Sequence, residues 1–293
     1  MNARGNAPIV AAVDGTGTAE VAALWAAEEA ARRNAPLLVF IAYGYDDTAF
    51  GGKVYPPSDW LMVKKIAAEE LLLETRSMLE VAVPGLEIGT KASERGPVPA
   101  LLEVSAHARM LVTGEPAGSI MGLFSGSPDV DLAAHAHCPV VVVRGTETPD
   151  GPVVVGVDGS PLSEAAIAWG FEEASMRNAP LLALYVWHDG DSAGLFSDGN
   201  VYFQGEAVED SGRRLLAQRL AGWQEKYPDV QVTRRVELDR PRHALLAASQ
   251  DAQLVVVGSR GRGGFAGLVL GSTSQALLHH ASCPVMVVRA ETA

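Results

Sequence analysis

Cysteine and long apolar runs are both scarce in this chain. Two cysteines among 293 residues are too few for a disulfide framework. No apolar run approaches the roughly 18 residues of a membrane-spanning helix, and the first residues, MNARGNAPIVAAVDG, lack the apolar core of a signal peptide. These absences argue against a disulfide-rich secreted domain and against a membrane protein, and they predict a cytoplasmic location.

Positive charge is also in short supply. The chain has 23 Lys and Arg against 35 Asp and Glu, which gives a net charge of −12. Binding to nucleic acid generally needs a positive surface that faces the phosphates, so we expect no nucleic-acid partner. A small local anion site remains compatible with this charge. Apolar residues, by contrast, make up 48% of the chain, which is typical of a globular protein with a substantial core.

The most informative feature is an internal repeat. The segment EEAARRNAPLLVF at 28–40 returns as EEASMRNAPLLAL at 172–184, an offset of 144 positions (172 − 28). The later segments HCPVVVVR and SCPVMVVR are offset by 145 positions (282 − 137), so the first copy is one residue shorter within a loop. We predict two domains, residues 1–146 and 147–293, with the polar stretch GTETPDGP (145–152) as the linker.

Each copy alternates apolar strand segments with helical segments. In the second copy, strands are expected near 152–158, 181–187, 230–238, 254–258 and 284–289. Most are continuous apolar runs, typical of buried parallel strands, whereas VQVTRRVEL alternates and suits a sheet edge. Ser160 and Pro161 predict the start of a helix. The pattern predicts an α/β fold of two tandem flavodoxin-like (Rossmann-like) doubly wound domains, each with a five-stranded, mostly parallel sheet in the order 3-2-1-4-5.

The last strand of each copy, PVVVVR or PVMVVR, is too apolar to leave at an open sheet edge. Pairing these two strands with each other would cover both edges. We therefore expect an internal pseudo-dimer formed in this way, and a homodimer in addition.

Glycine and arginine concentrate in GSRGRGGFAGLVLGST (258–273), directly after the strand near 254–258. Ligands of open parallel sheets bind at the carboxyl ends of strands where the strand order reverses, and Asp158 ends the first strand beside this point. Backbone N–H groups, Arg260, Arg262 and a helix beginning near Gly271 would all favour phosphate. We interpret the loop as a phosphate site, with a tight connection that binds nothing as the alternative. It is neither a Walker loop nor the dinucleotide fingerprint.

The spacing Gly258-x2-Gly261-x9-Gly271-Ser272 after an apolar strand resembles the ATP-binding pattern of the universal stress protein family. VVVGVDGS at the start of the copy and CPVMVVR at its end resemble the same family. The resemblance covers nearly the whole chain, as a tandem two-domain member of the kind common in mycobacteria and other actinobacteria.

The resemblance implies that ATP, with or without Mg²⁺, is bound in the second domain. It assigns Asp158 to the ribose or adenine with Gly156 allowing close approach, the Val186 backbone to the base, and Asp189 to the ribose. The phosphates are assigned to two stretches of the loop: Gly258, Ser259, Arg260, Gly261, Arg262, Gly263 and Gly264, then Gly271, Ser272 and Thr273. The alternative for Asp158 is a carboxylate that only caps the next helix.

The first copy departs from this pattern. Its loop reads GEPAGSIMGLFSGS, with Ala117 where the second glycine belongs, no arginine, and Glu115 where phosphates would lie. Ala12 replaces the strand glycine. The remaining candidates of this copy are Asp14, Gly114, Gly126 and Ser127. On electrostatic grounds, we expect the first copy to bind ATP weakly or not at all.

Three function classes follow. The first is a nucleotide-dependent regulator of stress response or growth. The second is a slow ATP hydrolase or adenylyl-transfer enzyme, although no general base, phosphate-reaching lysine or pair of magnesium carboxylates accompanies the loop, and we assign no catalytic residue. The third is a ligand-free scaffold that acts by dimerisation. No metal site is expected, because the histidines of HAHC (135–138) and HHASC (279–283) suit helix C-termini. Cys138 and Cys283 are expected to be buried.

Overall fold

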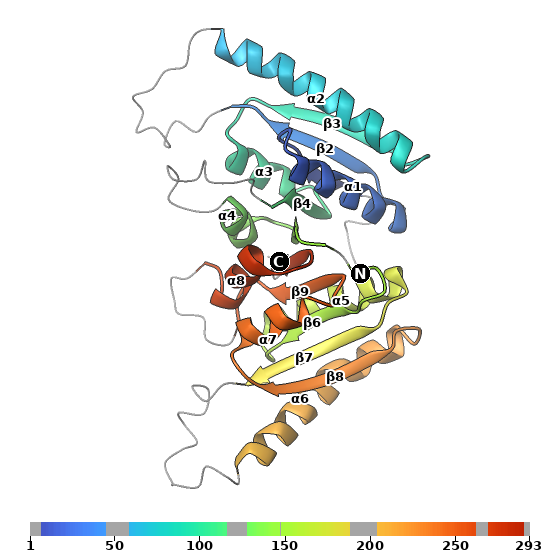
Figure 1. The fold of residues 1–293 in the computed structure, drawn as a ribbon, viewed down its shortest axis with the longest axis vertical. Helices are drawn as coiled ribbons and strands as arrows, with labels where there is room; N and C mark the ends of the chain where they lie inside the picture. Colours follow the sequence, from blue (N-terminus) through green and yellow to red (C-terminus); the bar gives the residue numbers. More distant parts are fainter. Residues whose placement is uncertain are drawn as a thin grey trace. The chain divides into compact units, whose positions relative to one another are not determined.

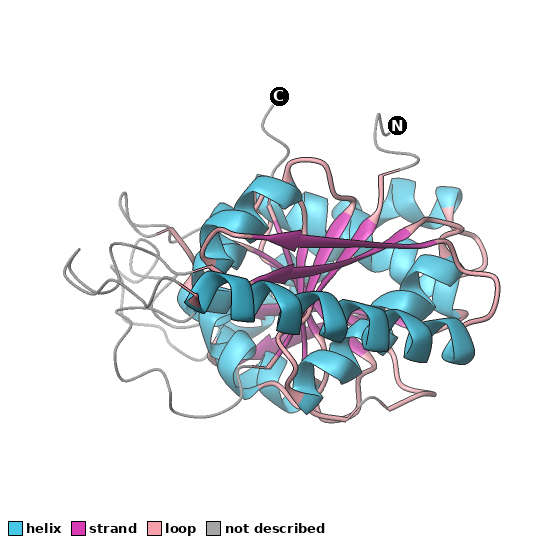
Figure 2. Cartoon of the chain, turned by 90° about the horizontal axis from the view of Figure 1, so that it is seen from above, coloured by secondary structure: helices cyan, strands magenta, loops and turns pink. Residues whose placement is uncertain are grey.

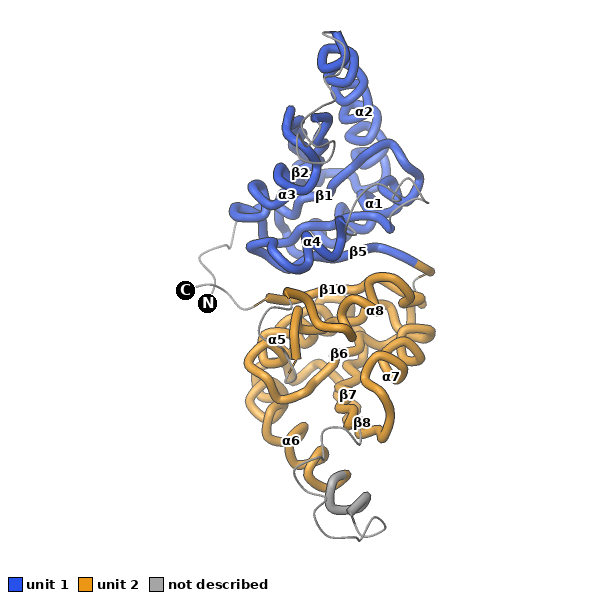
Figure 3. The backbone as a smooth tube through the Cα atoms, turned by 90° about the vertical axis from the view of Figure 1, so that its left-hand side faces the viewer, with its two compact units in different colours: residues 1–144, 291–293 blue, residues 145–290 orange. Residues whose placement is uncertain are grey.

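The computed structural model describes residues 7–44, 59–115, 128–146, 148–187, 204–261 and 269–289, with side chains from 209 onward in the fifth range. The chain divides into two compact units, coloured separately in Figure 3. Unit 1 comprises residues 1–144 and 291–293, and unit 2 comprises residues 145–290.

Unit 1 alternates strands and helices along the chain. Its elements are β1 (Ile9–Ala12), α1 (Gly17–Arg32), β2 (Leu37–Ala42), α2 (Trp60–Ala82), β3 (Ile88–Ser93), α3 (Pro97–Ser105), β4 (Met110–Gly114), α4 (Pro128–His135) and β5 (Val140–Val143). Its strands lie in the order β3-β2-β1-β4-β5, and their pairings are parallel.

Unit 2 repeats this arrangement (Figure 1). Its elements are β6 (Val153–Val157), α5 (Pro161–Arg177), β7 (Leu181–Trp187), α6 (Gln204–Lys226), β8 (Val232–Leu238), α7 (Pro241–Ala248), β9 (Leu254–Gly258), α8 (Ser272–His280) and β10 (Val285–Val288). The order β8-β7-β6-β9-β10 again consists of parallel pairs. The predicted order 3-2-1-4-5 is therefore confirmed in both units.

The burial of each strand follows its sequence. β6, β7, β9 and β10 are apolar and almost wholly buried, because helices lie on both sides of the strands (Figure 2). β8, the alternating segment, ends the strand order of unit 2 and is largely exposed or half-buried. The prediction that this segment forms a sheet edge is confirmed.

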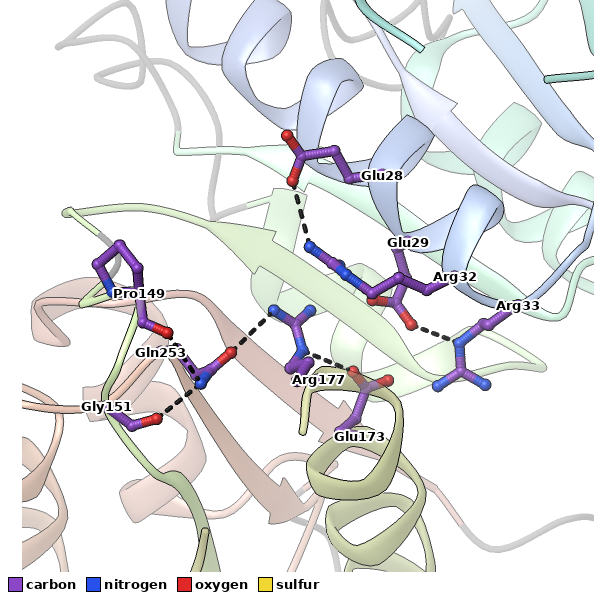
Figure 4. Close-up of polar contacts among 9 residues, drawn as sticks. All are labelled: Glu28, Glu29, Arg32, Arg33, Pro149, Gly151, Glu173, Arg177 and Gln253. Atoms are coloured by element: carbon purple, nitrogen blue, oxygen red, sulfur yellow. Dashed lines mark hydrogen bonds and ion pairs between the residues drawn. The ribbon is translucent and has the colours of Figure 1, made fainter. Parts of the chain in front are cut away.

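The repeated EEAARRN and EEASMRN segments form the same buried ion pair in each unit (Figure 4). At the end of α1, Arg33 binds Glu29, and both side chains are fully buried. At the end of α5, Arg177 Nε donates to Glu173 at 3.0 Å. An asparagine with positive φ follows each helix: Asn34 (48°) comes after the C-cap of α1, and Asn178 (52°) is the C-cap of α5. The strongest sequence repeat thus specifies how a helix ends and turns into the next strand.

Candidate functional site

The candidate site lies where β6 and β9 end side by side. The two strands pair in parallel, so their carboxyl ends meet at one edge of the sheet. The chain leaves β6 toward β7 on one side and leaves β9 toward β10 on the other. Asp158 follows β6, while Ser259 and Arg260 follow β9. The fold therefore brings the predicted aspartate and the predicted glycine loop to the same strand ends.

A tight turn fixes Asp158 at the entry to α5. Asp158 Oδ1 accepts from Ser160 N at 2.9 Å, and Gly159 between them has a φ of 80°, which favours glycine. Ser160 is the N-cap of α5, with its side chain accepting from Ser163 N. The carboxylate of Asp158 thus closes the turn, while a different residue caps the helix.

Two loop glycines are sites of close approach. A Cβ on Gly258 would lie 3.0 Å from Leu162 Cβ in the first turn of α5. A Cβ on Gly261 would lie 2.5 Å from Asp158 Oδ2, closer than real Cβ atoms come. Glycine at these positions lets the loop pass against α5 and over the aspartate.

The far end of the loop returns to its start. Gly271 N donates to Ser259 O at 2.8 Å, and Ser274 Oγ donates to Gly258 O at 2.8 Å. α8 begins at Ser272, as predicted, and its N-cap Gly271 supplies no side-chain hydrogen bond. The first turn of α8 therefore begins beside Ser259 and Arg260, without the side-chain cap that α5 has, and its N–H groups are a suitable arrangement for an anion.

Other predicted residues contribute less to this edge. Val186 is 6% exposed and pairs with Glu237 in the sheet. A Cβ on Gly156 would meet Val257 and Leu245 side chains at 3.1 and 3.3 Å, so glycine here relieves crowding in the core. Some predicted residues lie outside the described residues: Gly126, Ser127, Asp189, Arg262, Gly263 and Gly264.

Unit 1 has the same aspartate turn after its first strand, but different side chains lie at the carboxyl ends of β1 and β4. Asp14 Oδ1 accepts from Thr16 N at 3.0 Å and from Thr16 Oγ1 at 2.6 Å. A Cβ on Gly114 would lie 2.5 Å from Thr18 O, so packing of β4 against α1 requires this glycine whether or not a ligand binds. Glu115, the residue after β4, accepts from Arg144 Nη2 at 2.7 Å.

A second carboxyl group lies beside this ion pair. Asp129, in the first turn of α4, is 5% exposed and accepts from Thr113 Oγ1 at 3.4 Å. Burial raises the pKa of Asp129 to about 7, the charge of Glu115 adds to this, and the Thr113 bond and Arg144 oppose it. Two acidic groups thus occupy the edge of unit 1 where unit 2 has Ser259 and Ser274.

Asp129 and Arg144 were not among the residues predicted from the sequence, and neither was Arg289, which follows Val288 at the end of β10 as Arg144 follows Val143 at the end of β5. The two arginines close the repeated PVVVVR and PVMVVR segments, so the signal was present in the repeat. The arginines were overlooked because these segments were interpreted only as strands that pair with each other.

The remaining sequence candidates have structural roles. His135 lies in the last turn of α4 and His279 in the last turn of α8, which confirms the expected placement at helix C-termini. Cys138 and Cys283 are buried, also as predicted. Within the described ranges, no helix is both long and apolar enough to cross a membrane.

The model of the Universal stress protein family matches the chain twice, over residues 5–144 and 151–289. The chain belongs to this family. Its internal repeat is a tandem pair of universal stress domains, one in each unit. This confirms the resemblance drawn from the glycine spacing and from the strands that flank it.

Similar proteins span the same two-domain length. Universal stress protein Rv2005c of Mycobacterium tuberculosis is 39% identical over 290 residues, covering 96% of both chains. A universal stress protein of Mycolicibacterium smegmatis is 38% identical over the same length, again with 96% of both chains covered. The crystal structure of a universal stress protein from Archaeoglobus fulgidus DSM 4304 matches with a TM-score of 0.70 at 18% identity, covering 97% of this chain and 96% of that one. This last similarity supports the fold.

Proposed function

We propose that this universal stress protein binds ATP, chiefly in unit 2, and acts as a nucleotide-dependent regulator of stress response or growth. The observation that carries the proposal is the approach of Gly261 to Asp158, at the edge where the N-terminus of α8 lacks a side-chain cap. A carboxylate suits a ribose hydroxyl, and backbone N–H groups at a helix N-terminus suit phosphate. In unit 2 the loop that passes Asp158 at Gly261 also contacts the start of α8, through Ser259 and Gly271.

Within this proposal, Asp158 binds the ribose and the backbone at Val186 binds the base. The start of the loop and Gly271–Thr273 hold the phosphates, with Mg²⁺ accompanying them. The exposed Arg260 supplies positive charge.

The asymmetry between the units follows from charge. In unit 1 the phosphate position is taken by Glu115, already bound to Arg144, with Asp129 buried nearby. A triphosphate placed there would meet acidic groups and compete with an existing ion pair. We therefore propose one nucleotide per chain. The pairing of the two units as a pseudo-dimer, a homodimer and a cytoplasmic location remain predictions.

Calorimetric titration of the nucleotide-free, full-length protein with ATP tests the proposal. Asp158→Ala and Asp14→Ala form a matched pair, because each removes a carboxylate that closes the same turn. We expect one site per chain, weakened at least about 10-fold by Asp158→Ala and unchanged by Asp14→Ala.

Each other outcome has a definite meaning. Two sites per chain would overturn the asymmetry. Absence of binding would leave the glycine loop a tight connection and favour the ligand-free scaffold. Sustained phosphate release, lost in Gly261→Ala, would favour an ATP hydrolase.

A further inference from the structure

The two units place an arginine at the same position, one residue beyond the last strand. In unit 1, Glu115 N donates to Val143 O at 3.0 Å, and Arg144 follows Val143. In unit 2, Ser259 N donates to Val288 O at 2.7 Å, and Arg289 follows Val288. Glu115 and Ser259 are therefore structurally equivalent: the backbone N–H of each bonds to the residue that immediately precedes the arginine of its unit.

The equivalent arginines have different partners. Arg144 is 7% exposed and forms an ion pair with Glu115 at 2.7 Å. The residue opposite Arg289 is Ser259, a buried serine that carries no charge. Nη1 of Arg289 is buried and has no hydrogen-bond partner among the described residues. A buried donor without a partner is costly to the folded state, so this group lacks the anion that unit 1 provides internally.

A second cation adds to the uncompensated positive charge near Arg289. Burial, followed by the positive charge of Arg260, lowers the pKa of Arg289. Arg260 lies on the loop that begins at Gly258, and it is exposed. Two guanidinium groups close enough to repel each other are stabilised by an anion between or beside them.

The position along the sheet indicates which part of a ligand Arg289 faces. Asp158 follows β6, Ser259 follows β9 and Arg289 follows β10, and these strands are consecutive in the order. Neighbouring strands are about 4.8 Å apart, so the strand of Arg289 lies about 10 Å from that of Asp158. A ligand whose ribose contacts Asp158 would thus present to Arg289 the phosphate farthest from the sugar.

We propose that Arg289 is a further phosphate-binding residue of unit 2, which with Arg260 holds the terminal phosphates of the nucleotide. The residue one position beyond the fourth strand, Ser259 or Glu115, decides whether the arginine is available to a ligand. This inference rests on the proposed function, because it assigns a residue to the same site.

The test compares ATP, AMP and inorganic tripolyphosphate binding to the nucleotide-free, full-length protein. Arg289→Gln removes the guanidinium, and Arg234→Gln is the matched control: it removes the same charge from β8, at the opposite end of the strand order of unit 2. We expect Arg289→Gln to weaken ATP and tripolyphosphate about 10- to 100-fold with a much smaller effect on AMP, while Arg234→Gln changes none of them.

Ser259→Glu and Ser259→Ala give an independent test. Ser259→Glu recreates the carboxylate of unit 1 beside Arg289 and should weaken ATP at least as much as Arg289→Gln. Ser259→Ala, which removes only the hydroxyl, should have a smaller effect than Ser259→Glu.

The outcomes separate the two proposals. If wild-type protein binds ATP and Arg289→Gln binds it as tightly as Arg234→Gln does, Arg289 is not a phosphate ligand and the ATP proposal stands. An equal loss for AMP and ATP would also overturn the assignment to the terminal phosphates. If tripolyphosphate binds in an Arg289-dependent manner and ATP does not bind, the anion site stands and the nucleotide function fails. Both proposals fail if neither compound binds.

Discussion

Asp129 illustrates how much a single buried residue can tie stability to pH. Its folded pKa of about 7 lies above the ordinary value of 3.8, so the unfolded chain releases this proton at a lower pH than the folded chain does. Below about pH 4 the group is protonated in both states and contributes no pH dependence. As the pH rises from about 4 to 7, only the unfolded state ionises, and the folded state loses relative stability.

We predict that Asp129→Asn removes this loss. Relative to wild type, the variant should gain stability progressively between pH 4 and pH 7, by roughly 2–4 kcal/mol, and the gain should be constant above pH 7. Urea unfolding at a series of pH values measures the difference. A gain that is the same at pH 4 and pH 8 would show that Asp129 ionises normally in the folded protein. Asp131→Asn, an exposed neighbour in the same helix, is the control.

For single residues, the sequence predicted those whose motif or charge marks them without knowledge of their neighbours in the fold. It identified Asp158 from its place at a strand end, Gly261 from the glycine spacing and Glu115 from the comparison of the two copies, and the structure brings Gly261 close to Asp158. It did not identify Arg144 or Arg289, because each arginine ends an apolar strand and becomes significant only through its cross-strand neighbour. Asp129 was missed because its burial depends on the packing of α4 against α3 and β5 and on its contact with Thr113 of β4, which no local pattern records.

At the scale of elements, the close contact between β4 and α1 gives a direct prediction for Gly114. Gly114→Ala places a Cβ 2.5 Å from the backbone oxygen of Thr18, and backbone atoms cannot move aside as a flexible side chain can. We expect a loss of about 1–3 kcal/mol in the free energy of unfolding, measured by urea unfolding followed by circular dichroism.

Gly222→Ala is the control. Gly222 lies in α6, and a Cβ there would meet nothing within 4 Å. Alanine is the better helix former, so this variant should gain about 0.5–1 kcal/mol. If Gly114→Ala is as stable as wild type or gains stability as Gly222→Ala does, the contact between β4 and α1 does not require glycine.

Most elements were predictable because their determinants are local. Buried apolar runs gave the strands, the Ser160-Pro161 pair gave the start of α5, and alternation in VQVTRRVEL gave the edge strand β8. Whether a given glycine is required by a ligand or by packing was less predictable. Gly156 was assigned to close approach of a nucleotide, yet a Cβ there would crowd Val257 and Leu245, and only the packed core reveals this.

At the scale of the whole molecule, the proposed asymmetry predicts that ATP stabilises one unit alone. A ligand at 100 times its Kd stabilises the folded form by about 2.7 kcal/mol, which slows exchange through global unfolding about 100-fold. We expect amides of β6 and β9 that exchange by this route to slow by that factor, and amides of β1 and β4 to be unchanged. Hydrogen exchange with and without ATP measures both units in one sample.

Asp158→Ala is the control for this experiment, since at the same ATP concentration it should reduce the slowing in unit 2 from about 100-fold to about 10-fold or less. Equal slowing in β1 and β6 would mean that unit 1 binds nucleotide too or that the units unfold together. The two-unit organisation that makes this comparison meaningful was visible from the sequence, because the repeat covers nearly the whole chain.

The ion pair between Glu115 and Arg144 also bears on how readily evolution could reverse the divergence of the two copies. Replacing Glu115 with serine would remove the carboxylate that pairs with the buried guanidinium of Arg144, which costs stability before any ligand can compensate. Under the proposed function, binding would also need a glycine in place of Ala117 and the residue that the first loop lacks. Each of these steps yields little without the others, so under the proposed function no single mutation would give the first copy a nucleotide site like that of the second.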